Sequence, residues 1–193
     1  MVQAARKSLN SEVNPGLERG YVQVYTGNGK GKTTAAIGLA IRAIGAGLKV
    51  YIAQFMKNGN SSEFKCIEKL TDDIKIDSFL VAESNRVRNR NNVRSIDGLP
   101  QSTDWQTRLK NIFLSQQFDI VILEEANMAI MCGLMFAEDI LSIIAAKPLS
   151  VELVITGRYA HPDIIERADL VTDMKEVKHY YQDGVNARMG IEQ

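Results

Sequence analysis

The chain has 193 residues, the size of one compact domain, and 45% of its residues are hydrophobic while 24% are charged. Its 23 Lys and Arg residues balance its 23 Asp and Glu residues, so no net charge attracts nucleic acid or an anionic membrane. Cys66 and Cys132 form neither a CxxC pair nor a zinc-type cluster, and no long apolar run or signal peptide occurs. We therefore expect a cytoplasmic protein with no nucleic-acid partner and no membrane span.

The order of polar and apolar segments predicts a short tail and one α/β domain. Residues 1–19 are polar and aperiodic, so we expect a tail or arm there and a single domain over 20–193. In chain order the pattern predicts strand 21–25, helix 33–44, strand 49–55, helix 63–70, strand 74–80, helix 105–114, strand 120–123, helix 137–146, strand 151–155, a helical turn 162–167 and strand 170–171. Residues 82–100 are polar and irregular. Such alternation predicts parallel βαβ units, in a mostly parallel sheet flanked by helices.

A glycine-rich turn joins the first strand to the first helix. Residues 26–33 match the phosphate-loop pattern GxxxxGK(S/T) at its last three positions, with Thr26 in place of the first glycine. Since a strand precedes it and a helix follows, its backbone N–H groups can point at phosphate oxygens. In such loops the lysine, here Lys32, contacts phosphate, and the next hydroxyl, Thr33, helps to hold Mg²⁺. The turn thus predicts an ATP site and a P-loop NTPase-like (RecA-like) fold, the alternative being a solvated turn.

A phosphate loop also needs a carboxylate at the end of a nearby strand, to hold the metal directly or through water. Glu124 and Glu125 follow the apolar run 120–123 and supply this carboxylate. Adjacent side chains of an extended segment point to opposite sides, so we expect only one of the two to face the phosphates. The alternative is a solvated strand end.

Six segments share their order and spacing with one known family. They are YTGNGKGKTT at 25–34, QFMK at 54–57, LEEAN at 123–127, TGR at 156–158, VKH at 177–179 and DGVNARMGIE at 183–192. Together they resemble the ATP:corrinoid adenosyltransferases of the CobA type. The resemblance implies a transferase of cobalamin synthesis or salvage that moves the 5′-deoxyadenosyl group of ATP to cobalt(I) of a corrinoid and releases tripolyphosphate. It also implies a homodimer and a reduced flavoprotein as electron donor.

The resemblance assigns roles to individual residues. Lys32, Thr33 and Glu125 would be catalytic, and Thr33 and Glu125 would hold Mg²⁺, with Glu124 as the alternative ligand. Nucleotide contacts would come from Gly27, Asn28, Gly29, Lys30, Gly31, Lys32, Thr33, Thr34, Arg42 and Arg158. Arg42 could equally be a surface charge of its helix.

Two features depart from the family pattern. Glu124 stands where the family usually has Asp, and residues 81–94 lack the aromatic segment that the family often places over the corrinoid. The arginines of that stretch, Arg86, Arg88, Arg90 and Arg94, are interpreted as a solvated loop or as corrinoid contacts. Two other functions stay open, a P-loop ATPase or kinase acting at the γ-phosphate and a non-catalytic binder of nucleotide or corrinoid.

A few further residues have structural interpretations. We expect Trp105 to pack on its helix, His161 to start a helix and His179 to make a structural contact. Met128, Met131 and Met135 are expected in the core.

Overall fold

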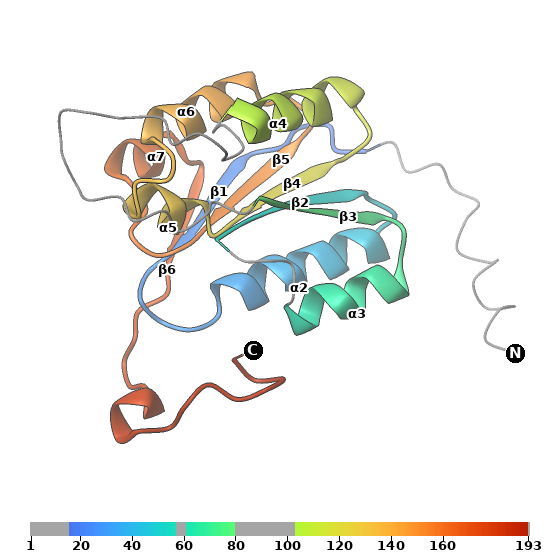
Figure 1. The fold of residues 1–193 in the computed structure, drawn as a ribbon. Helices are drawn as coiled ribbons and strands as arrows, with labels where there is room; N and C mark the ends of the chain where they lie inside the picture. Colours follow the sequence, from blue (N-terminus) through green and yellow to red (C-terminus); the bar gives the residue numbers. More distant parts are fainter. Residues whose placement is uncertain (1–15, 57–60, 80–102, 193) are drawn as a thin grey trace, which may run out of the picture.

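A computed structural model describes residues 16–56, 61–79 and 103–192, and shows a parallel sheet covered by helices on both faces (Figure 1). The sheet has six strands in the order β3-β2-β4-β5-β1-β6. The strands are β1 (Val22–Thr26), β2 (Val50–Phe55), β3 (Ile74–Phe79), β4 (Ile120–Glu124), β5 (Glu152–Thr156) and β6 (Leu170–Asp173). The helices are α2 (Lys32–Gly45), α3 (Ser62–Leu70), α4 (Thr103–Ser115), α5 (Ala126–Met131), α6 (Ala137–Ala146), α7 (Pro162–Arg167) and the 3₁₀ turn η1 (Tyr180–Asp183).

The two faces of the sheet bury two separate cores, because successive side chains of a strand point to opposite faces. In β2, Tyr51, Ala53 and Phe55 belong to the core under α4, α5, α6 and α7. Val50 and Ile52 belong to the core under α2 and α3 (Figure 1). Central strands that are covered on both faces read as unbroken apolar runs in the sequence. In the described part of the chain, none of the helices has the length and apolarity that crossing a bilayer requires.

The expected α/β fold is confirmed, and each expected element lies within two residues of its predicted ends where the chain is described. The sequence pattern predicts neither α5 nor η1, which span only six and four residues and are too short to show a helical period. The expected core position of Met131 is wrong. Helix α5 buries Ala126, Asn127 and Ala129, whereas Met131, its last residue, is 43% exposed.

The strand order determines how far the phosphate loop lies from the acidic end of β4. Strand β5 lies between β1, which leads into the loop, and β4, which ends at Glu124. The carboxyl ends of these three parallel strands therefore meet at one edge of the sheet, where ligands bind in open α/β folds. Thr156, the last residue of β5, comes to lie beside the acidic end of β4.

Candidate active site

The phosphate loop runs from the end of β1 to Lys32, the first residue of α2. Gly31 precedes the helix with a φ of 122°, a conformation that favours glycine. Lys32 is buried, and its Nζ donates to the carbonyl oxygens of Gly27 and Gly29 at 2.7 Å each. Burial and, second, the nearby Arg158 lower the pKa of Lys32, while Glu125, Glu124 and Asp173 oppose that shift. The ammonium group of Lys32 thus interacts electrostatically with one arginine and three carboxylates.

Glu124 faces the start of α2. Ile120 and Ile122 of β4 belong to the core under α2, and the two-residue period puts Glu124 on the same face. Glu124 is only 1% exposed, and its carboxylate accepts hydrogen bonds from two hydroxyl groups. Thr33 Oγ1 donates to Oε1, and Thr156 Oγ1 donates to Oε2 at 2.6 Å.

Glu125 does not continue the strand. Its φ of 61° is in the left-handed region, and the residue precedes the first turn of α5. Its backbone N–H donates to Thr156 Oγ1 at 3.0 Å, and the residue lines the same cavity as Lys32 and Thr33. The extended conformation expected for the pair therefore ends at Glu124, and both acids lie near the phosphate loop, Glu124 in contact with Thr33 and Glu125 in the lining of the cavity.

A cavity of about 750 Å³ lies against the phosphate loop and the outer face of α2. The sequence-predicted residues that line it are Asn28, Gly29, Lys30, Gly31, Lys32, Thr33, Thr34, Glu125 and Arg158. The other lining residues are Ile37, Gly38, Ile41, Ser62, Glu63, His179, Gly190, Ile191 and Glu192. Gly27 and Arg42 are not among its lining residues, and Arg42 lies exposed in the last turn of α2. Most predicted nucleotide contacts are thus brought together around one cavity.

The glycines of the phosphate loop also allow the backbone just after β6 to pack closely against the loop. The Gly29 N–H donates to the Met174 carbonyl oxygen at 2.6 Å, and the Met174 N–H donates to the Thr26 carbonyl at 2.9 Å. A methyl group added at Gly29 would lie 2.7 Å from the Met174 carbonyl oxygen. The segment after β6 therefore braces the phosphate loop from behind.

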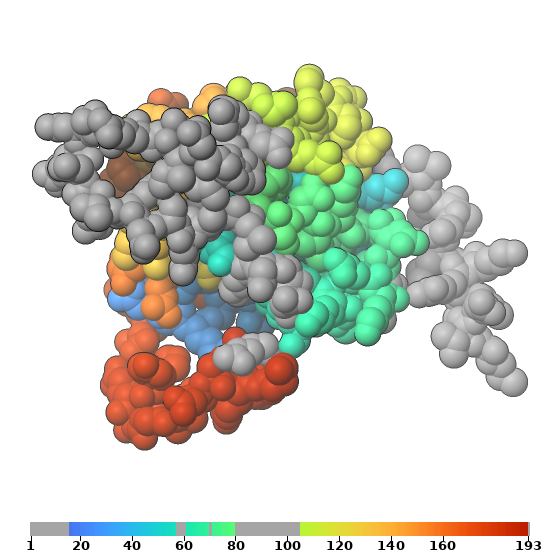
Figure 2. Space-filling view, in the orientation of Figure 1, coloured from blue at the N-terminus to red at the C-terminus, as the bar shows by residue number. Residues whose placement is uncertain are grey.

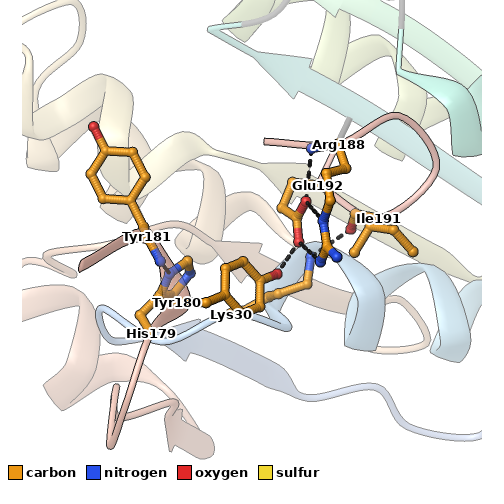
Figure 3. Close-up of polar contacts among 7 residues, drawn as sticks. All are labelled: Lys30, His179, Tyr180, Tyr181, Arg188, Ile191 and Glu192. Atoms are coloured by element: carbon orange, nitrogen blue, oxygen red, sulfur yellow. Dashed lines mark hydrogen bonds and ion pairs between the residues drawn. The ribbon is translucent and has the colours of Figure 1, made fainter. Parts of the chain in front are cut away.

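Residues 174–192, which we call the C-terminal strap, continue from this brace to the mouth of the cavity. Figure 2 shows the strap (red) as a continuous surface at one edge of the molecule. Figure 3 shows Tyr180 and Arg188 converging on the Glu192 carboxylate. Arg188 contacts Glu192 through its backbone N–H at 2.8 Å and through its guanidinium at 3.2 Å. Lys30 Nζ donates to the Ile191 carbonyl at 2.6 Å, which ties the strap to the loop.

The remaining predicted residues have the structural contacts expected of them. Trp105 is buried and meets the Phe55 ring edge-on, with 5.4 Å between the ring centroids. His161 caps α7, and its Nδ1 accepts the Asp163 N–H at 3.3 Å. His179 caps η1 by accepting the Tyr181 N–H at 3.1 Å, and it also lines the cavity.

Sequence reasoning assigned no role to Thr156 or to the last residues of the strap, Arg188, Ile191 and Glu192. Both lie within segments that carry the family resemblance, TGR at 156–158 and DGVNARMGIE at 183–192, and this membership is the only signal that could have found them. The arginines at 86, 88, 90 and 94 lie outside the described residues.

The parallel sheet, the glycine-rich loop before α2 and the hydroxyl-to-carboxylate contact at the sheet edge define an α/β protein of the P-loop type. Over residues 18–193 the chain matches the family described as ATP:corrinoid adenosyltransferase BtuR/CobO/CobP. The chain therefore belongs to the ATP:corrinoid adenosyltransferase family and is a transferase.

Three relatives illustrate this membership. The corrinoid adenosyltransferase CobA of Salmonella typhimurium is 35% identical over 179 residues, which cover 91% of this chain and 86% of the relative. The corrinoid adenosyltransferase of Escherichia coli K12 is 34% identical over 178 residues, with 91% and 86% covered. That of Pseudomonas aeruginosa is 32% identical over 180 residues, with 91% and 84% covered. The similarity thus extends over nearly the whole of this chain.

Proposed function

We propose that this protein transfers the 5′-deoxyadenosyl group of ATP to cobalt(I) of a corrinoid, in the synthesis or salvage of cobalamin. A lone pair of cobalt(I) forms the bond to C5′, the C5′–O bond breaks, and its electron pair leaves on tripolyphosphate. Cobalt(I) is itself a strong nucleophile, so the protein has to align C5′ and stabilise the charge of the leaving group. The observation that carries the proposal is the cavity itself, in which the phosphate loop, Arg158 and Glu125 meet in a chain of this family, with Glu124 in contact with the lining residue Thr33.

The triphosphate would lie along the loop at the start of α2. Lys32 would replace one or both of its hydrogen bonds to loop carbonyl oxygens by hydrogen bonds to phosphate oxygens. A hydrogen bond between opposite charges is stronger than one to a neutral carbonyl. Arg158 lines the cavity near Lys32 and would add a second positive charge. Farther along, Ile37 and Ile41 of α2 and Ile191 of the strap offer an apolar wall for the nucleoside.

The residues present fit a Mg²⁺ ion that travels with ATP. Thr33 and Glu124 supply a hydroxyl and a carboxylate, the hard oxygen ligands that Mg²⁺ prefers. Among the described residues no cluster of three or more His, Cys, Asp or Glu forms a metal cage, which suits an ion that takes its remaining ligands from phosphate and water. When bound, the ion would neutralise charge on the leaving triphosphate. Glu125, the first choice from the sequence, also lines the cavity and is the competing ligand.

The wider setting is proposed from the family resemblance. We propose a cytoplasmic homodimer that receives electrons from a reduced flavoprotein. The single domain at 20–193 and the tail at 1–19 belong to the same proposal, and the start of the family match at residue 18 supports that boundary.

The proposal is tested by the cobalt product. The protein, MgATP and a chemically reduced cobalt(I) corrinoid should give a cobalt–carbon species whose visible spectrum reverts on exposure to light. The signal should require ATP and should fall strongly in Lys32→Ala. A wild-type protein that binds MgATP but forms no light-sensitive product would refute the transferase proposal.

A further inference from the structure

Thr156 ends the strand that separates the phosphate-loop strand from the acidic strand. Its side chain is fully buried, and neither the phosphate-loop pattern nor the resemblance gives it a role. Val154, two residues earlier, belongs to the core under α2, so the period of the strand aims Thr156 at the same face as Glu124. The fold therefore places a hydroxyl group directly beside the buried acid.

The Thr156 hydroxyl links the two adjacent glutamates. It accepts the backbone N–H of Glu125 at 3.0 Å and donates to Glu124 Oε2 at 2.6 Å. Because the N–H occupies a lone pair of the oxygen, the hydroxyl proton is directed to the carboxylate. The other carboxylate oxygen, Oε1, accepts from Thr33 at the start of α2. One side of Glu124 is thus held by β5, while its other side meets the phosphate loop.

The contact between Thr156 and Glu124 bears on the replacement of the family's usual Asp by Glu at position 124. Glu124 stands where the family usually has Asp, and its side chain is longer by one C–C bond, about 1.5 Å. A longer chain has one more rotatable bond and needs an additional contact to settle in one orientation. We propose that Thr156 is a positioning residue, which holds the longer carboxylate of Glu124 so that its Oε1 faces Thr33 and the metal end of the triphosphate. The inference rests on the MgATP part of the proposed function.

The test removes the hydroxyl and shortens the acid, alone and together. Thr156→Val keeps the shape of the side chain, and Thr156→Ser keeps the hydroxyl as the matched control. Each is made in the wild-type protein and in Glu124→Asp. Calorimetry measures ATP affinity as a function of Mg²⁺ concentration, which requires no corrinoid and no turnover.

We expect Thr156→Val to raise the Mg²⁺ concentration for half-maximal tightening of ATP by about 10-fold, the size typical of residues that orient a metal ligand. Thr156→Ser should restore the Mg²⁺ dependence to within about twofold of wild type. In Glu124→Asp the same valine should change it by less than about twofold, because the shorter acid would no longer depend on Thr156. ATP affinity without Mg²⁺ should be the same with threonine, serine or valine at position 156 within each background.

Three results would overturn the inference. They are an unaltered Mg²⁺ dependence in Thr156→Val, an equal effect of the valine in both backgrounds, or failure of serine to restore the wild-type value. If Thr156→Val does not fold, Thr156→Ala takes its place, with urea unfolding as the check. A shift in Mg²⁺ dependence in a protein that makes no cobalt–carbon product would refute the transferase proposal and leave this inference standing.

Discussion

Two glutamates near the proposed nucleotide cavity, Glu124 and Glu192, are held in different ways. Glu124 is almost fully buried, and its partners Thr33 and Thr156 belong to a helix and a strand of the fold. Glu192 lies in the strap, and its partners Tyr180 and Arg188 belong to the same segment. The sheet therefore determines the position of the first carboxylate, whereas a local loop determines that of the second. Breaking the buried cluster should affect the chemical step, and breaking the cluster in the strap should mainly affect ATP binding.

The largest expected effect is that of Glu124→Gln. Removing the charge of the acid that contacts Thr33 should lower kcat for adenosyl transfer by on the order of 100-fold, as expected when a metal-orienting group is lost. Glu125→Gln is the matched control, and should cost less than about 10-fold because its carboxylate is not the one that contacts Thr33. Steady-state kinetics at saturating ATP measure both. A larger loss in Glu125→Gln would assign the metal to that acid.

Lys32→Ala should come next. It removes a charge-assisted hydrogen bond to phosphate worth about 1.5 to 3 kcal/mol, so MgATP affinity should fall roughly 10- to 100-fold. Lys30→Ala is the control within the same loop, since the Lys30 ammonium group contacts the Ile191 carbonyl of the strap. Calorimetry with MgATP compares the two. Equal losses in both variants would mean that Lys30, which also lines the cavity, contributes as much to nucleotide binding as Lys32.

The buried region is also the one that the sequence predicts well. Unbroken apolar runs and the glycine-rich turn predict the strands, α2 and the loop, because burial on both faces of a parallel sheet leaves a clear pattern. The same reasoning fails at Glu125, which follows the strand in a left-handed backbone conformation. Such a conformation is usually signalled by a glycine in the sequence, and none is present at this position.

The strap could not be predicted from periodicity. Its only regular element is the four-residue turn η1, and its course depends on side-chain contacts of Glu192 and on the Met174 carbonyl. Such contacts join residues far apart in the sequence, as between Lys30 and Ile191, and no composition or spacing signals them. Only the family resemblance of the segment 183–192 marks it as part of the site.

Glu192→Gln should have a smaller effect than the loop and metal-site variants. Glutamine keeps one acceptor oxygen but removes the charge and the second oxygen, so the contacts of Tyr180 and Arg188 should weaken and the strap should hold the Ile191 carbonyl on Lys30 less firmly. Because an ion pair whose arginine is half exposed contributes little, we expect KM for ATP to rise about threefold with kcat unchanged. Steady-state kinetics with ATP as the varied substrate provide the measurement. A large fall in kcat would place Glu192 with the buried cluster.

The pH dependence of KM for ATP tests whether the ionised carboxylate of Glu192 holds the strap. Hydrogen bonds from Arg188 and Tyr180 lower the pKa of Glu192 to about 2. A carboxylate whose pKa is lowered contributes fully above its ordinary pKa, and the contribution is lost only as pH falls through the lowered value. The ratio of KM between Glu192→Gln and wild type should therefore stay constant between about pH 5 and pH 8. A ratio that collapses toward one within this range would show that the ionised carboxylate does not hold the strap.

The most direct test of the account is the identity of the phosphate product. Transfer at C5′ predicts tripolyphosphate, formed only when both ATP and the cobalt(I) corrinoid are present and in an amount equal to the cobalt–carbon product. Anion-exchange chromatography of the quenched reaction separates tripolyphosphate from orthophosphate and ADP. Orthophosphate and ADP as the main products, formed with or without corrinoid, would contradict the account and indicate an enzyme that acts at the γ-phosphate.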